Sequence, residues 1–191
     1  MLTRVDGRRA VVAFKAQLTT LSGAVGVMWA SLGVNAVLGG ALFRYGVVPR
    51  TITGLRGIVF APFIHANVAH LAANTVPFAL LGWLVMLSGR RRFLRVTLAA
   101  MLGSGLMAWL LGASGSVHIG ASGVIFGYLG YLMLTGVFTR NFWSIALSVG
   151  VTALWGGLVF GVMPGQAGIS WQAHFGGFVA GVLAARALRG R

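Results

Sequence analysis

The sequence has almost no acidic residues: in 191 residues, Asp6 is the one aspartate or glutamate. Paired carboxylates are therefore impossible, which excludes aspartyl proteases, glycosidase-type acid pairs and zinc proteases of the His-Glu-x-x-His type. A Ser-His-Asp triad is excluded too, because Asp6 precedes the first apolar run of the chain. Any chemistry must therefore use histidine, serine, threonine, asparagine or backbone amides.

Cysteine is absent, and charged residues make up only 8% of the chain against 58% hydrophobic residues. The lack of cysteine excludes a disulfide, a thiolate nucleophile and a thiolate metal site. The apolar residues fall into six runs, each close to the roughly 20 residues that cross a bilayer. These runs are residues 21–43, 67–87, 96–112, 120–138, 144–163 and 171–188. The composition therefore predicts an all-α, polytopic membrane protein with six transmembrane helices.

The net charge of +14 is informative because of where the basic residues lie. Twelve of the 15 are on alternate connections, which the positive-inside rule makes cytoplasmic together with both termini. We interpret the charge as an orientation signal with some attraction to membrane lipid headgroups, and we expect no nucleic-acid partner. Residues 1–20 are predicted to form a basic cytoplasmic tail, and residues 21–191 one membrane domain. The connections 44–66, 113–119 and 164–170 then face outward.

Polar side chains gather where three runs enter the membrane from the predicted outer face. His70 and Asn74 are four residues apart on the second run and share a helix face, while Ser122 opens the fourth run and His174 the sixth. An isolated polar group at this depth is costly, so we interpret the four as one site. Taken singly, each has a structural alternative, such as interhelical packing or a hydrogen bond to a carbonyl.

The tetrapeptide Gly-Ala-Ser-Gly occurs twice and offers two candidate nucleophiles, Ser114 and Ser122. Ser114 precedes a polar loop, so we interpret it as a turn residue. Ser122 begins an apolar run, and its amide therefore belongs to a helix N-terminus, where free N–H groups favour negative charge. These positions favour Ser122. We expect His65 and His118 to be interfacial or loop residues.

Glycines recur at helical spacing on the fourth and sixth runs. The fourth run has Gly123, Gly127 and Gly130, and the sixth has Gly177 and Gly181. Such spacing lets two helix backbones approach closely. A serine on one helix needs this approach to reach a histidine on the other, at about 2.6–3.2 Å.

The polar residues and glycines form three ordered motifs: His65-x4-His70-x3-Asn74, Gly120-Ala-Ser-Gly123 and His174-x2-Gly177-x3-Gly181. On these motifs the sequence resembles the rhomboid family of intramembrane serine proteases, from about residue 21 to residue 188. The resemblance implies a six-helix rhomboid-like bundle with a Ser–His dyad in a wet cavity that opens to the extracytoplasmic side. It implies cleavage of transmembrane protein substrates near the outer ends of their membrane segments, and we expect no cofactor and no metal.

The resemblance also implies roles for the polar residues of the motifs. Ser122 would be the catalytic nucleophile, and His174 the general base that then protonates the leaving amine. The Ser122 amide, His70 and Asn74 would stabilise the oxyanion. The arrangement resembles the minimal bacterial form of the family, which places the protein in a bacterial inner membrane.

The remaining motif residues have packing roles in this resemblance. Gly120 and Gly123 would shape the turn around the nucleophile, and Gly177, with Gly181 one turn further, would face the fourth run. Phe126 would stack on the catalytic imidazole.

Many rhomboids carry a Trp-Arg pair in the first outer connection, and this sequence has none there. Its absence leaves the shape of that connection open. One alternative function is a catalytically inactive rhomboid-like protein that binds transmembrane helices. A small transporter or channel is disfavoured, since the chain shows no half-to-half repeat and no acidic coupling residue. The fifth run is either a movable gate or a plain lipid-facing helix.

Overall fold

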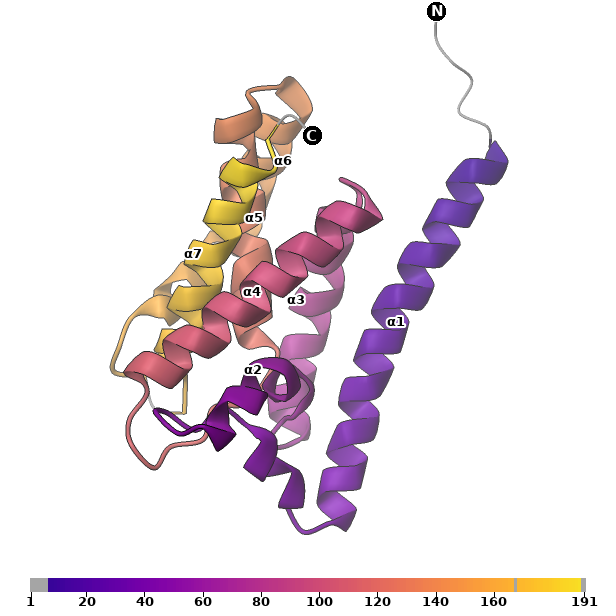
Figure 1. The fold of residues 1–191 in the computed structure, drawn as a ribbon. Helices are drawn as coiled ribbons and strands as arrows, with labels where there is room; N and C mark the ends of the chain where they lie inside the picture. Colours follow the sequence, from indigo (N-terminus) through magenta and orange to yellow (C-terminus); the bar gives the residue numbers. More distant parts are fainter. Residues whose placement is uncertain (1–6, 167, 190–191) are drawn as a thin grey trace, which may run out of the picture.

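In the computed structural model, which describes residues 7–166 and 168–189, the regular elements are all helical (Figure 1). In chain order they are α1 (Gly7–Val37), η1 (Ala41–Tyr45), η2 (Thr53–Arg56), α2 (Gly57–Phe60), η3 (Ala61–Phe63), α3 (Val68–Met86), α4 (Arg90–Leu111), α5 (Ser122–Thr139), α6 (Phe142–Trp155), η4 (Gly156–Val162) and α7 (Trp171–Ala187). The all-helical class predicted from the sequence is confirmed.

Five helical segments are long and apolar enough to cross a membrane, which confirms a multi-pass membrane protein. They are Ala10–Val37, Val68–Met86, Arg90–Leu111, Ser122–Thr139 and, with α6 and η4 together, Phe142–Val162. The sixth predicted run corresponds to α7, which has 17 residues and is not one of these five. Six crossings therefore stay a prediction. α1 begins and α7 ends at the same end of the bundle (Figure 1).

The first helix differs from its predicted bounds of 21–43, since α1 begins at Gly7 and ends at Val37. It begins early because residues 8–22 contain no glycine or proline that would interrupt it. It ends where Gly39 and Gly40 have φ values of 59° and 87°, a backbone region that glycine adopts at little cost. The division into a tail and a membrane domain stays a prediction.

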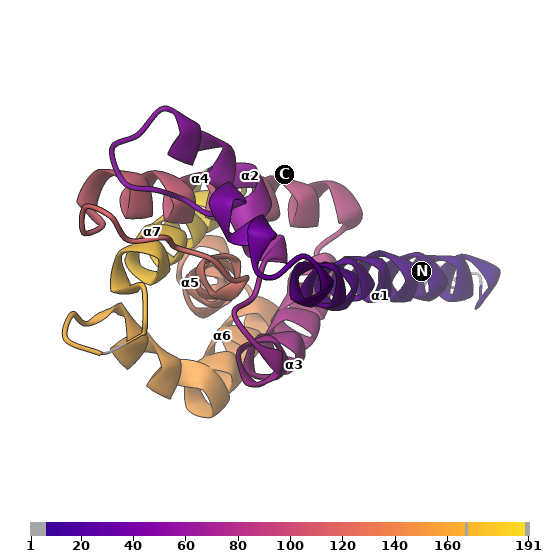
Figure 2. The same ribbon diagram turned by 90° about the horizontal axis from the view of Figure 1, so that it is seen from below.

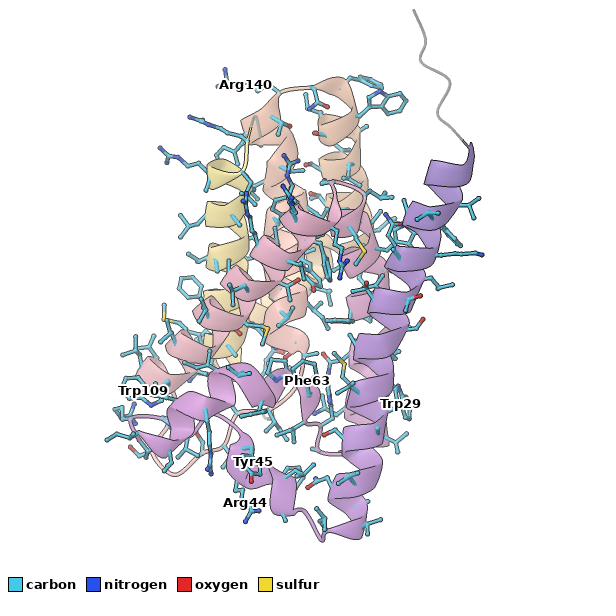
Figure 3. All side chains as sticks on the ribbon, turned by 45° about the vertical axis from the view of Figure 1, so that its right-hand side comes forward. Trp29, Arg44, Tyr45, Phe63, Trp109 and Arg140 are labelled. Carbon is cyan, nitrogen blue, oxygen red and sulfur yellow. The ribbon has the colours of Figure 1, made fainter. Side chains whose placement is uncertain are left out.

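The predicted first outer connection, residues 44–66, is folded into short helices and carries its own cation–aromatic cluster. The guanidinium carbons of Arg44 and Arg56 lie 5.1 Å and 4.6 Å from the centre of the Tyr45 ring. Figure 3 shows Arg44 and Tyr45 at the end of the molecule opposite Arg140. The cluster therefore orders the connection in which the Trp-Arg pair is missing.

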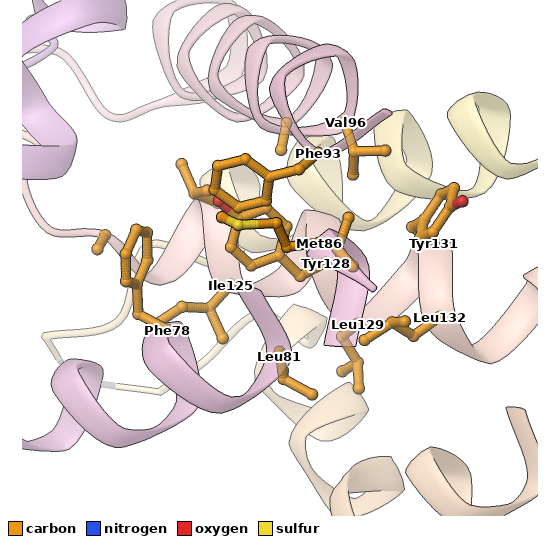
Figure 4. Packing of buried hydrophobic residues seen from close by; sticks show 14 of the residues in the cluster. Phe78, Leu81, Met86, Phe93, Val96, Ile125, Tyr128, Leu129, Tyr131 and Leu132 are labelled. Atoms are coloured by element: carbon orange, nitrogen blue, oxygen red, sulfur yellow. The ribbon is translucent and has the colours of Figure 1, made fainter. Parts of the chain in front are cut away.

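α5 is the central helix of the bundle. Seen along the bundle in Figure 2, it is surrounded by α3, α4, α6 and α7, while α1 lies outside against α3. Its residues from Gly123 to Leu132 are all buried, and Figure 4 shows Tyr128 packed among aromatic and aliphatic side chains that include Phe93. The buried Tyr128 hydroxyl is hydrogen-bonded to Thr97 Oγ1 at 2.9 Å. A helix packed on all sides gives its first residue, Ser122, a fixed position.

The most extensive helix–helix contact joins α5 and α7, and glycines make it possible. A Cβ atom on Gly177 would collide with the carbonyl oxygen of Gly123, and one on Gly181 with that of Gly127. Two backbones can touch in this way only where side chains are absent. The glycine spacing read from the sequence thus lies at the contact between these two helices.

We predict that Gly181→Ala lowers the free energy of unfolding by about 1–3 kcal/mol, because the added methyl group overpacks a rigid backbone contact. The matched control is Gly150→Ala in α6, where a Cβ would have no atom within 4 Å. This control should unfold like the parent protein when both are titrated with denaturant in detergent. Equal stability of the parent and Gly181→Ala would show that the two helices are not in backbone contact.

Candidate active site

Ser122 is the first residue of α5, and the turn before it depends on Gly120. Gly120 has a φ of 109°, which L side chains rarely adopt, and its amide donates to the Ala61 carbonyl at 2.9 Å. A Cβ at this position would lie 2.8 Å from two atoms of the His70 ring. Glycine is therefore required by both conformation and space, and the turn lies against His70.

His174 lies in the first turn of α7, and its Nε2 is 2.8 Å from Ser122 Oγ. α7 begins after Ser170, whose hydroxyl oxygen accepts a hydrogen bond from the Ala173 amide at 3.4 Å. The structure thus brings together two side chains that are 52 residues apart in the sequence. They meet because the backbone contact of α5 with α7 lies directly beside them, at Gly123.

Two contacts orient the His174 imidazole. Nδ1 is 2.9 Å from the Gly161 carbonyl oxygen in η4, and the Phe126 ring stacks on the imidazole with 4.0 Å between centroids and 11° between planes. A carbonyl oxygen only accepts, so Nδ1 carries the hydrogen and Nε2 presents its lone pair. In this tautomer the Ser122 hydroxyl donates to His174. In Ser-His-Asp triads a carboxylate accepts the Nδ1 hydrogen of the histidine; for His174 the acceptor is the backbone carbonyl of Gly161.

His70 and Asn74, the other two polar residues of the predicted site, are one turn apart on α3. The buried Asn74 side chain donates from Nδ2 to the His70 carbonyl at 2.8 Å, which uses one of its two N–H groups. The His70 ring packs against Gly120, and its Nδ1 faces the Ala66 amide at 3.5 Å. This leaves Nε2 to carry the ring hydrogen, so each side chain can supply an N–H donor.

His65 lies in the loop before α3, in agreement with the expected interfacial or loop position, and it is fully buried there. Its Nε2 accepts a hydrogen bond from the amide of Ala121, the residue before Ser122, at 3.3 Å. Its ring also lies edge-on to His70, with 5.1 Å between centroids. Sequence reasoning missed this contact, although the spacing of His65 and His70 at the start of a run was an available signal.

Ser114, the serine of the first Gly-Ala-Ser-Gly, lies in an exposed loop between α4 and α5. Its Oγ accepts from the Arg50 guanidinium at 2.7 Å, and the same guanidinium donates to the Leu110 carbonyl at 3.0 Å. The Ser114 side chain therefore closes a loop contact, and it makes a useful control for Ser122.

A small cavity of about 20 Å³ borders Ser122 and is lined in part by Ser104, His118 and Ser170. That volume is close to what one buried water molecule requires, and such a molecule needs two to four polar partners. A larger cavity of about 610 Å³ lies between α5 and α6 beside Arg140, at the other end of α5. The polar space at Ser122 is therefore narrow in this structure.

Burial, and then the neighbouring His70, lowers the pKa of His65 from 6.5 to about 4. The unfolded chain therefore binds more protons than the folded protein between pH 6.5 and 4, so the free energy of unfolding falls as the pH falls through this range. We expect a loss on the order of 3 kcal/mol by pH 4. Denaturant unfolding in detergent between pH 7.5 and 4 measures this loss, and the free energy of unfolding of His65→Asn should vary less with pH. If the free energy of unfolding fell equally steeply with pH in the parent and in His65→Asn, His65 would not be the source of the dependence.

Comparison with known proteins gives relatives in bacteria. Residues 49–191 match the Rhomboid domain. The uncharacterized protein Rv1337 of Mycobacterium tuberculosis is 42% identical over 175 residues, which are 87% of this chain and 73% of the relative. The uncharacterized protein ML1171 of Mycobacterium leprae is 45% identical over 139 residues, which are 69% of this chain and 55% of the relative. Rhomboid protease GluP of Bacillus subtilis is 30% identical over 128 residues, which are 65% of this chain and 24% of GluP.

The matched region contains all the helices from η2 to α7, and with them the three motifs. Rhomboid domains belong to a family of intramembrane proteases that act on membrane proteins. The five apolar helices agree with this membrane setting. This chain therefore belongs to the rhomboid family.

Proposed function

We propose that the protein is an intramembrane serine endopeptidase in which Ser122 and His174 form the catalytic dyad. The observation that carries the proposal is the 2.8 Å contact between Ser122 Oγ and His174 Nε2. A serine hydroxyl is a weak nucleophile unless an adjacent base takes its proton, and the oriented lone pair of His174 offers that base. Membership of the rhomboid family supports the same reaction class.

The reaction begins with attack of Ser122 Oγ on the scissile carbonyl carbon, as the hydroxyl proton moves to His174 Nε2. The resulting imidazolium keeps its Nδ1–H on the Gly161 carbonyl. When the tetrahedral intermediate collapses, Nε2–H protonates the leaving amine and an acyl-enzyme remains. In the second half of the reaction, water transfers a proton to Nε2 as it attacks the ester carbon of the acyl-enzyme. When this second intermediate collapses, Nε2 returns the proton to Ser122 Oγ and the carboxylic acid product leaves.

Negative charge on the substrate oxygen requires donors that are in place before the reaction. We assign this role to the Ser122 amide at the N-terminus of α5, to His70 Nε2–H and to the remaining side-chain N–H of Asn74. The packing of His70 against Gly120 supports the assignment, because it holds a donor near the turn that carries the nucleophile, and the buried Asn74 amide is bonded to the His70 carbonyl one turn along α3.

We also propose that α7 is a sixth crossing and that the dyad opens to the extracytoplasmic side of a bacterial plasma membrane. At 1.5 Å per residue α7 rises about 26 Å, close to a hydrocarbon core of about 30 Å. The basic segments that begin α1, begin α4, follow α5 and end α7 lie at one end of the bundle (Figure 1), and the positive-inside rule makes that end cytoplasmic. The bacterial relatives support the compartment.

The substrates are transmembrane segments of other membrane proteins. A helical carbonyl is hydrogen-bonded and shielded, so the segment must unwind before Ser122 can reach it, and free backbone is costly in lipid. A polar site at the membrane edge lowers that cost. α6 is the candidate gate for lateral entry, since Ser148 and Val151 are its only buried residues.

We predict that Ser122→Ala and His174→Ala each reduce cleavage of a reporter transmembrane substrate at least ~10³-fold in liposomes, because each removes one half of the proton-transfer pair. Ser114→Ala is the matched control and should cleave like the parent. A fluorophosphonate should label the parent at Ser122 and leave Ser122→Ala unlabelled. A parent that neither cleaves nor labels would instead identify an inactive, helix-binding member of the family.

We predict that Gly161→Ala lowers kcat about 10–100-fold with a smaller change in KM, because misplacing the base by a fraction of an ångström is costly. A Cβ at Gly161 would lie 2.8 Å from the Phe126 ring and 3.2 Å from His174 Nδ1. Gly157→Ala, in the same short helix, is the control, since a Cβ there has no atom within 4 Å. Equal kcat values for these two variants would exclude η4 from orienting the base.

A further inference from the structure

His118 lies in the connection between α4 and α5, four residues before Ser122, and is held on both its backbone and its ring. Its backbone N–H and carbonyl pair with those of Val47, each at 2.9 Å. Its ring reaches Ser170 Oγ from Nδ1 at 2.6 Å and Ser116 Oγ from Nε2 at 3.0 Å. The side chain thus connects the segment before α5 to the start of α7.

Counting donors and acceptors assigns each hydrogen in the hydrogen-bond chain from Ser116 through His118 to Ser170. Ser116 Oγ donates its single hydrogen to the Ala113 carbonyl at 2.6 Å, so it can only accept from His118 Nε2–H. The other ring nitrogen of a neutral imidazole accepts, and Ser170 Oγ–H therefore donates to Nδ1. Burial lowers the pKa of His118, which favours this neutral form. Each hydrogen in this hydrogen-bond chain then has one acceptor.

Ser170 connects the His118 ring to the first turn of α7, which carries His174. Its hydroxyl oxygen caps α7 through the Ala173 amide, and its carbonyl accepts the His174 amide at 3.1 Å. His118 and Ser170 are 52 residues apart, as are Ser122 and His174. Ser122 comes four residues after His118, and His174 comes four residues after Ser170. Two parallel cross-links therefore join the same two segments, one of them at the dyad.

We propose that His118 is a positioning residue for the dyad, acting through Ser170 to hold the start of α7 against the turn that carries Ser122. The inference deepens the proposed function and rests on it. His118 does not touch the reacting atoms; it helps to hold the first turn of α7 at the distance that the glycine contact between α5 and α7 allows. Without it, the N-terminal turn of α7 keeps its cap but loses this side-chain tie to the connection before α5.

The test compares His118→Ala, Ser170→Ala and the double variant in liposomes, with Ser114→Ala as a control in the same loop. We expect each single variant to lower kcat about tenfold, the loss that removing one hydrogen bond produces, with KM unchanged. The double variant should be no slower than the slower single variant, since both remove the same link. Ser170→Thr keeps the hydroxyl and should retain most of the parent rate.

A normal kcat for His118→Ala would overturn the proposal, as would additive losses in the double variant. A lower melting temperature with an unchanged rate of fluorophosphonate labelling at Ser122 would also overturn it, because it would show a structural role alone. Labelling separates this inference from the proposed function. A parent that labels but does not cleave would contradict the peptidase assignment, while slower labelling of His118→Ala would still support positioning.

Discussion

The backbone contact between α5 and α7 is the constraint on which the rest of the site depends. Gly177, three residues after His174, contacts the carbonyl of Gly123, the residue after Ser122. The distance between the Ser122 and His174 side chains therefore follows from the distance between the two helices. Any side chain at Gly177 would push α7 away from α5. The glycines therefore act on function through distance, and the central, buried position of α5 makes that distance rigid.

The site uses uncharged hydrogen-bond acceptors and no acidic side chain. A carboxylate in the membrane would be costly, and the one acid in the sequence precedes α1. The Gly161 carbonyl takes the Nδ1 hydrogen of His174, and the His65 ring accepts the Ala121 amide beside Ser122. The Gly161 carbonyl and the His65 ring are uncharged acceptors already positioned by the fold, so they orient His174 and the turn before Ser122 without a buried carboxylate.

The predicted outer connections contribute more to the site than their polarity suggested. Residues 44–66 fold under the start of α5, and this brings His65 from the start of one run to the turn of another. The short connection 113–119 is likewise tied to Val47 and to Ser170 through His118. Periodicity could not reveal these contacts, because the segments that make them have no helical repeat of their own.

The sequence by itself determined the helical class, the multi-pass character and the family, since run length, composition and motif spacing are local properties of the chain. It also brought Ser122, His174, His70 and Asn74 forward as candidates, because polar residues are conspicuous in so apolar a sequence. Tertiary structure alone decided which carbonyl faces His174 and what the His118 ring binds. Those outcomes depend on how closely distant segments pack, and no single stretch of sequence encodes that packing.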